Sequence, residues 1–314
     1  MKFKNKTLNK IKLELFYIRR LLQEGYGPRY WWPYFKNRFF QRYLTKNLSH
    51  YEYEADPDLE LHTICHKDGI YMLFWMLRSF LKLSKLRPTI IVNDDGTLDK
   101  EAEEFLKSKF SNIKILFREE TAKLAAEIPG IPEIVRQVTA KGHFFMHRLI
   151  SVLALSKAKK VIVMDIDILF YKPPTELVDF VFGRLDCDAL VHRQPNEVNF
   201  DMMVDETYDK KYKLTEKQIA LMNGGFLILD RDKINFDQLA EYLAHAKRPI
   251  TDYFIEMVAW ACLLAQMNFK FLSPERYAIK GFLNDQMVFK HYSGPRRYEM
   301  FAYGLDAMRK VINE

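Results

Sequence analysis

The fold prediction rests on the stretch Val161-Ile162-Val163-Met164-Asp165-Ile166-Asp167-Ile168-Leu169-Phe170. Its apolar first half is typical of a strand that is buried on both faces of a sheet. Because side chains alternate along a strand, we expect Asp165 and Asp167 to point to the same side at its carboxyl end. Two such carboxylates repel each other unless a cation or strong donors compensate, which favours a site for a hard divalent cation. The alternative is a pair of surface acids that pairs with Lys172 or caps a helix.

Apolar strands and amphipathic helices alternate on both sides of this stretch. The alternation predicts an α/β fold, a single Rossmann-like domain with a mostly parallel central sheet flanked by helices. In such sheets, ligands bind beyond the carboxyl ends of the strands. We expect strands at residues 61–65, 89–92, 113–116, 160–164, 188–191 and 225–229, and helices at residues 70–83, 98–110, 147–156 and 253–266.

Positive charge is concentrated at the start of the chain. The 314 residues carry a net charge of +7, with 48 basic and 41 acidic residues. Residues 1–50 hold 12 of the basic and 2 of the acidic residues, so this part contributes +10 and the remainder −3. A nucleic-acid partner is not expected, because phosphate binding needs a basic body or stripe. We divide the chain into a basic, aromatic-rich N-terminal segment (1–55) and a catalytic domain (56–314).

The N-terminal segment has two interpretations. Apolar and basic residues alternate at roughly helical spacing over residues 8–23, and residues 1–50 contain 12 aromatic residues. Basic residues mixed with Trp and Tyr suit the interface of an anionic membrane, which would then be a partner of residues 1–50. The alternative is a helix that packs its apolar face on the catalytic domain and leaves its lysines in water.

The cysteines and the first residues of the chain indicate the cellular compartment of the protein. Cys65, Cys187 and Cys262 are too widely spaced for a disulfide framework or a zinc site, so a reducing compartment is expected. No run of 18 uncharged apolar residues occurs, and the first residues lack the apolar stretch of a signal peptide. We therefore expect a cytoplasmic protein, peripheral at the inner face of the membrane if residues 1–50 bind lipid.

Four further motifs accompany the acid pair. They are His147-Arg148-Leu149, Met222-Asn223-Gly224-Gly225-Phe226-Leu227-Ile228-Leu229, Ser273-Pro274-Glu275-Arg276-Tyr277 and Lys290-His291-Tyr292-Ser293-Gly294-Pro295-Arg296-Arg297. In order and spacing, these motifs resemble those of nucleotide-sugar glycosyltransferases of the A-type fold. They are most similar to family 8, which includes glycogenin and bacterial lipopolysaccharide glycosyltransferases. The resemblance covers roughly residues 60–300, and Arg297 stands where the family has a lysine.

The resemblance implies a metal-dependent transfer of a hexose from a nucleotide-diphosphate sugar, chiefly a UDP-sugar, to a glycan or lipid-linked acceptor. It implies retention of the anomeric configuration, although no residue is identified as a covalent nucleophile. Asp165, Asp167 and His291 would bind Mn²⁺ or Mg²⁺. The remaining implied contacts are His62, Thr63 and Asp95 to the nucleoside, Arg148, Gly294 and Arg297 to the diphosphate, and Asn223, Gly224 and Glu256 to the sugar, with Asn223 and Glu256 as the catalytic residues.

The helix after the Asn223-Gly224 strand departs from the family pattern. Many relatives have Asp-Gln there, and the counterpart in this chain is Ile255-Glu256-Met257. Glu256 can accept sugar hydroxyls or place a carboxylate near the anomeric carbon, whereas Met257 cannot replace a glutamine amide. Burying Glu256 in this apolar stretch without a partner would be costly, which favours a functional role.

Two other functions remain as alternatives. Haloacid-dehalogenase-type phosphatases also place an acid pair after an apolar strand, but they need Thr or Val where this chain has Leu169, and their motif usually lies near the N-terminus. The second alternative is a non-catalytic, membrane-associated protein that keeps a glycosyltransferase-like fold.

Overall fold

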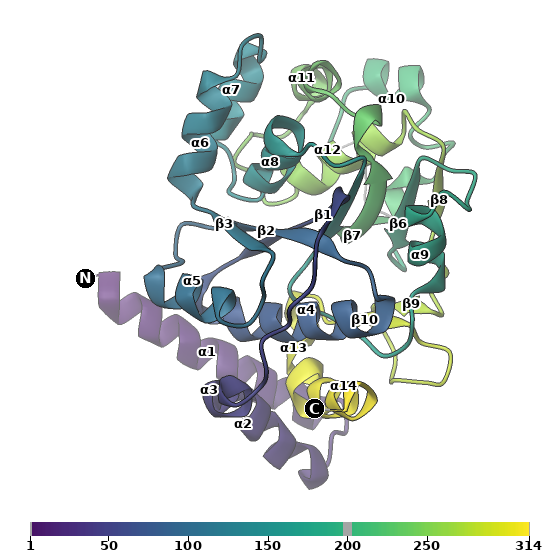
Figure 1. The fold of residues 1–314 in the computed structure, drawn as a ribbon. Helices are drawn as coiled ribbons and strands as arrows, with labels where there is room; N and C mark the ends of the chain where they lie inside the picture. Colours follow the sequence, from purple (N-terminus) through teal and green to yellow (C-terminus); the bar gives the residue numbers. More distant parts are fainter. Residues whose placement is uncertain (1, 197–202, 314) are drawn as a thin grey trace.

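The computed structural model describes residues 2–196 and 203–313, and its centre is one twisted sheet between two layers of helices (Figure 1). The seven strands follow the order β3-β2-β1-β4-β7-β6-β8. Their bounds are β1 (Asp56–Cys65), β2 (Pro88–Asp94), β3 (Ile113–Leu116), β4 (Lys160–Met164), β6 (Ala189–Arg193), β7 (Met222–Asp230) and β8 (Phe269–Phe271).

The sheet is mostly parallel, as the sequence predicts. β3, β2, β1 and β4 run parallel, and β6 and β8 are parallel to each other. β7 is antiparallel to both of its neighbours, β4 and β6. In the centre, Ile162 of β4 lies opposite Leu61 of β1 on one side and Ile228 of β7 on the other.

Helices cover both faces of the sheet because its central strands are apolar on both faces. Alternate residues of β4 belong to different hydrophobic clusters: Ile162 and Met164 to one, and Val161 and Val163 to the other. The first cluster packs against α4 (Ile70–Ser84) and α5 (Lys100–Lys107). The opposite layer contains α6 (Arg118–Glu127), α7 (Glu133–Lys141), α8 (Met146–Leu155), α11 (Phe236–His245) and α12 (Ile255–Leu264) (Figure 1). Two shorter helices, α9 (Thr175–Val181) and α10 (Glu206–Tyr212), complete the domain.

Two of the expected helices are shorter than their apolar patterns. The helix expected at 98–110 spans Lys100–Lys107, because Asp99 caps its start by accepting a hydrogen bond from the Ala102 amide at 3.0 Å. The helix expected at 253–266 begins at Ile255, after two aromatic residues that remain outside it.

A second, smaller sheet has the order β5-β10-β9 and was not predicted. Its strands are β5 (Ile168–Phe170), β9 (Tyr277–Ala278) and β10 (Phe289–His291). β10 pairs antiparallel with β5, and His291 lies opposite Ile168. This pairing brings a residue from late in the chain next to the residues that follow β4.

The N-terminal segment forms α1 (Lys2–Gln23), α2 (Trp31–Phe39) and α3 (Gln41–Lys46), which lie beside the last helices of the chain (Figure 1). One side of α1 is packed against the body, with Tyr17 and Leu21 each 2% exposed. α2 is anchored by Asn37, which contacts the turn Met300–Gly304 and α14 (Leu305–Ile312). Among the described residues, no helix combines the length and the apolar character that crossing a bilayer requires.

We expect Asn37→Ala to lower the free energy of unfolding by about 2 kcal/mol, because it leaves buried polar partners unsatisfied. The Asn37 amide donates to the Phe301 carbonyl at 2.9 Å and to Asp306 at 3.1 Å, and its oxygen accepts from Arg309 at 2.7 Å. Urea unfolding measures the change. Asn47→Ala, at an exposed position, is the control, and equal effects of the two substitutions would contradict the anchoring role.

Candidate functional site

The acid pair lies in a turn and not on the strand itself. β4 ends at Met164, and Asp165-Ile166-Asp167 forms the turn that leads into β5. The prediction that alternation along the strand places both acids is therefore wrong, and a pair of backbone hydrogen bonds positions them instead. The Asp165 amide donates to the Gly225 carbonyl of β7, and the Tyr292 amide donates to the Asp167 carbonyl, each at 2.8 Å.

Asp165, Asp167 and His291 form a cluster suited to a divalent cation. Each offers a ligand atom, and these atoms lie within 4.8 Å of one another. Nε2 of His291 is 3.1 Å from Oδ1 of Asp167 and 3.7 Å from Oδ2 of Asp165. Oδ1 of Asp167 is buried and accepts no hydrogen bond of good geometry from the described residues. Two carboxylates and an imidazole fit Mn²⁺ well, and the carboxylates also suit Mg²⁺.

Each acid also contacts an arginine. Nε of Arg297 donates to Oδ2 of Asp167, and Nη1 of Arg148 donates to Oδ1 of Asp165, both at 2.7 Å. Burial by itself would raise the pKa of Asp167, but the Arg297 guanidinium and then His291 outweigh burial and hold that pKa well below its usual range. Asp167 is therefore ionised at neutral pH, as a metal ligand must be.

Glu256 has the partner that its burial requires. Nε and Nη2 of Arg148 donate to its two oxygens at 2.8 and 2.9 Å, and Nε1 of Trp260 donates at 3.1 Å. Burial raises the pKa of Glu256, whereas Arg148 opposes that rise. Arg148 thus joins Asp165 to Glu256 on α12, and the catalytic role of Glu256 remains a prediction.

A cavity of about 470 Å³ opens over this cluster. Ten of the twelve predicted site residues line it: Asp95, Arg148, Asp165, Asp167, Asn223, Gly224, Glu256, His291, Gly294 and Arg297. They come from the turns just after β2 and β4, the start of β7, the first turns of α8 and α12, the last residue of β10 and the segment that follows it. The carboxyl edge of the parallel strands is therefore where the cavity lies, as such sheets lead one to expect.

His62 and Thr63 do not line the cavity. Both are fully buried, and the His62 ring lies between Ser151 Oγ at 3.2 Å and Glu60 Oε2 at 2.9 Å. They occupy the middle of β1, which continues to Cys65. The residues of this strand end that reach the cavity are Ile64, Cys65 and His66.

Four aromatic side chains that we call the aromatic wall also line the cavity and were missed as site residues. Phe144 and Phe145 immediately precede α8, and Tyr253 and Phe254 immediately precede α12. Ring centroids lie 4.5 Å apart for Phe144 and Phe145, 5.2 Å for Phe145 and Tyr253, and 5.1 Å for Tyr253 and Phe254. Tyr253 is 61% exposed and Phe254 is 42% exposed. The sequence feature that could have indicated them is a pair of aromatic residues directly before each of the two helices that carry Arg148 and Glu256.

Gly225 leaves room for the His291 ring. A Cβ atom at Gly225 would lie 2.3 Å from Cε1 of His291, far inside van der Waals contact. The second glycine of the Gly224-Gly225 pair is therefore needed for the position of the histidine.

We expect Gly225→Ala to weaken Mn²⁺ binding about tenfold or more, because the ring must shift to relieve the overlap. Calorimetric titration with Mn²⁺ measures the loss, and circular dichroism checks the fold. Gly27→Ala is a matched control, since a Cβ atom there meets nothing within 4 Å and the backbone φ is −68°. Unchanged Mn²⁺ affinity in Gly225→Ala would contradict this role.

Comparisons with known proteins identify the fold. No protein-family model matches the sequence, and a search of curated proteins finds no significant match. Among solved structures, the bifunctional glycosyltransferase WbbM matches at 12% identity with a TM-score of 0.51, over 84% of this chain and 53% of that one.

Two further solved structures are similar. An active-site mutant of LgtC matches at 15% identity and a TM-score of 0.48, over 81% of this chain and 95% of that one. Mouse xyloside xylosyltransferase 1 matches at 13% identity and a TM-score of 0.46, over 76% of this chain and 99% of that one. With the match to WbbM, the sheet order confirms the predicted architecture: the chain has the A-type glycosyltransferase fold.

Proposed function

We propose that the protein is a metal-dependent glycosyltransferase that transfers a hexose from a nucleotide-diphosphate sugar, with a UDP-sugar as the donor. The observation that carries this proposal is the Asp165, Asp167 and His291 cluster, which lies in the cavity beside Arg148 and Arg297. An A-type fold with this cluster at the strand ends is suited to binding a diphosphate through a cation.

The diphosphate end of the donor would lie beside Arg297 and the cluster of Asp165, Asp167 and His291. A bound Mn²⁺ or Mg²⁺ supplies positive charge to the departing diphosphate. Arg297 adds a guanidinium from the protein, held in place by its bond to Asp167. The backbone of Gly294 is accessible here, since a Cβ atom at that position would meet nothing within 4 Å. The nucleoside would then extend toward His66 and Asp95, which line the same cavity.

The sugar end would lie near Asn223, Gly224 and Glu256, which line the cavity together with Arg148. Both oxygens of Glu256 are bonded to Arg148, so Glu256 acts first by fixing this guanidinium. Asn223 is fixed as well, because its Oδ1 accepts from the Gly225 amide at 3.0 Å. Retention of the anomeric configuration is part of the proposal, with no covalent nucleophile assigned.

The acceptor would be a glycan, free or linked to lipid, that contacts the aromatic wall. A pyranose presents an apolar C–H face that packs against aromatic rings while its hydroxyls stay wet. The wall adjoins Glu256 and Arg148, where the sugar end of the donor would lie. We also propose a cytoplasmic location, because all three cysteines are free and buried, in keeping with a reducing compartment. A position at the inner face of the membrane would follow only if residues 1–50 bind lipid.

Asp167→Asn is expected to remove the metal dependence of UDP binding. The substitution keeps the shape of the side chain but removes a ligand charge, so UDP affinity in Mn²⁺ should fall about tenfold or more, toward the value in EDTA. Calorimetry in both buffers gives the comparison, with exposed Asp58→Asn as the control. A wild-type affinity for UDP that is the same in Mn²⁺ and in EDTA would sink the metal role.

Tyr253→Ala is expected to raise the KM for a glycoside acceptor about tenfold, through loss of an aromatic surface. Metal-dependent hydrolysis of a UDP-hexose without acceptor should stay within about twofold of wild type, because the wall would not hold the donor. Phe182→Ala is the control, since Phe182 is 62% exposed and lies outside the cavity lining. A loss of UDP affinity instead would mean that the wall binds the nucleoside.

A further inference from the structure

Exposed apolar side chains are concentrated on the N-terminal helices. Within the part of the chain that the structure describes, 18 large hydrophobic residues are exposed, and 12 of them belong to residues 8–43. We call these 12 residues the outer face: Leu8, Ile11, Leu13, Leu15, Phe16, Leu22, Trp31, Trp32, Phe35, Phe39, Phe40 and Tyr43. So much apolar surface on three helices marks an interaction site.

The outer face includes a regular stripe along α1. Leu8, Ile11, Leu15 and Leu22 recur every three, four and seven residues and are 48–60% exposed. They share one side of the helix. This stripe is distinct from the buried stripe through Tyr17 and Leu21. On α2, Trp32, Phe35 and Phe39 have the same spacing and are 69%, 41% and 58% exposed.

The exposed charged residues that the N-terminal helices themselves carry are basic, although Lys10 pairs with Asp68 and Arg42 lies 3.9 Å from Glu101. Lys12, Arg19, Arg29, Arg42 and Lys46 are all exposed. The acids among residues 8–46 are Glu14 and Glu24, and both are paired within the protein. Glu14 accepts from Tyr34 at 2.6 Å and from Arg38 at 2.6 Å. Glu24 pairs with Arg20 at 2.5 Å and accepts from Tyr298.

This pattern fits an anionic lipid surface. Trp and Tyr favour the headgroup level, while Lys and Arg bury their stems and keep their charges at the phosphates. A second copy of the chain fits poorly, since two faces of the same positive charge would repel each other.

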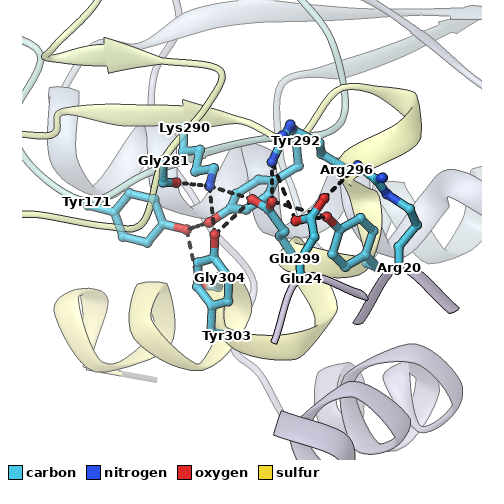
Figure 2. A network of polar contacts seen from close by, with 11 residues as sticks. Arg20, Glu24, Tyr171, Gly281, Lys290, Tyr292, Arg296, Glu299, Tyr303 and Gly304 are labelled. Carbon is cyan, nitrogen blue, oxygen red and sulfur yellow. Dashed lines mark hydrogen bonds and ion pairs between the residues drawn. The ribbon is translucent and has the colours of Figure 1, made fainter. Parts of the chain in front are cut away.

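The helix α1 and Glu24, the residue that follows it, contact the segment that carries Arg297. The Tyr17 hydroxyl donates to the Gly294 carbonyl at 3.3 Å, and Glu24 binds Tyr298 and lies 3.9 Å from Arg296. Figure 2 shows Arg20 of α1, and Glu24 just after this helix, next to Arg296 and Glu299. The inner side of α1 thus packs on the residues that flank Arg297.

The contacts continue to the residue next to the metal ligand His291. Lys290, fully buried, donates to Glu299 at 2.5 Å and to Tyr303 at 2.6 Å, and Glu299 pairs in turn with Arg296 at 2.5 Å (Figure 2). A continuous set of ion pairs and hydrogen bonds therefore runs from α1 to β10. A partner that fixes the position of α1 would therefore also fix the segment that carries His291 and Arg297.

The geometry points to the outer face as a docking surface for an anionic phospholipid bilayer, which holds the donor site beside acceptors carried by that bilayer. The docking itself stands on the exposed residues alone. The choice of a bilayer-borne acceptor rests on the proposed glycosyltransferase function.

The first test is binding of the full chain to vesicles of phosphatidylcholine with and without one third phosphatidylglycerol. Sedimentation should show at least about tenfold tighter binding to the anionic vesicles, weakening as salt is raised. The double variant Lys12→Glu/Arg19→Glu should lose that preference, and Leu15→Ser/Trp32→Ser should weaken binding about tenfold. We call these two double variants the outer-face variants. Lys270→Glu/Lys280→Glu, with the same change of charge at exposed positions, and Phe182→Ser are the matched controls.

Tryptophan fluorescence gives an independent measurement on the same samples. Trp75 and Trp260 are 1% and 0% exposed, whereas Trp31 and Trp32 are 43% and 69% exposed, so a blue shift on anionic vesicles reports the outer face. Trp32→Phe should reduce that shift. Equal binding to neutral and anionic vesicles, binding unchanged in both outer-face variants, or self-association in sedimentation velocity that only those variants abolish would overturn the proposal.

Two further measurements separate this inference from the proposed function. The outer-face variants should keep the Mn²⁺-dependent UDP affinity of the wild type. They should transfer sugar normally to a soluble glycoside but about tenfold more slowly to the same glycoside on a lipid anchor in anionic vesicles. Loss of UDP binding in the wild type would refute the proposed function and leave vesicle docking standing. Equal loss with both acceptors would refute the docking role.

Discussion

Two like charges held close together are the constraint on which the site depends. Asp165 and Asp167 lie in one cluster whose ligand atoms are within 4.8 Å of one another, and such a pair is stable only when positive charge surrounds it. Arg148 and Arg297 supply that charge, His291 faces both acids, and each of the three comes from a different element. The positions of α8, β10 and the segment after β10 therefore depend on the two acids of one three-residue turn.

The antiparallel direction of β7 is a second feature on which the site depends. Because β7 runs against β4, its first residues, Asn223 to Gly225, lie beside the acid turn at the carboxyl end of β4. The Gly225 carbonyl accepts a hydrogen bond from the Asp165 amide, and the lack of a side chain at Gly225 leaves room for the His291 ring. A parallel strand in this place would bring its last residues there instead, and the double glycine would lie at the other end of the sheet.

The sequence allowed the central sheet to be predicted well, since strands buried on both faces are continuous apolar runs. The strands at 113–116 and 160–164 have the predicted bounds. The small sheet was missed because strands of two or three residues, such as Tyr277–Ala278, show no periodicity.

The site residues that belong to a sequence motif could be predicted, whereas several of those outside the motifs were misplaced or missed. Ten of the twelve line the cavity, but His62 and Thr63 do not, because a strand end cannot be located to two residues from an apolar run. The aromatic wall was missed because its rings come together only when α8 and α12 pack side by side. For the N-terminal segment, the two interpretations describe opposite sides of one helix: Tyr17 packs on the body, while Leu15 is 60% exposed.

The contacts of α2 reach across almost the whole chain, and this affects the order of assembly during synthesis. Asn37 bonds to Phe301 and Arg309, 264 and 272 residues later. Such distant pairing forms slowly, because the intervening chain must first be ordered. On the ribosome, the acid turn emerges well before His291 and Arg297, so in a growing chain Asp167 lacks its two partners and α2 lacks the residues that cover its buried side. The cluster of Asp165, Asp167 and His291, with Arg297 beside it, can therefore form only after residue 297 has been synthesised, and a shorter chain is a target for chaperones and proteases.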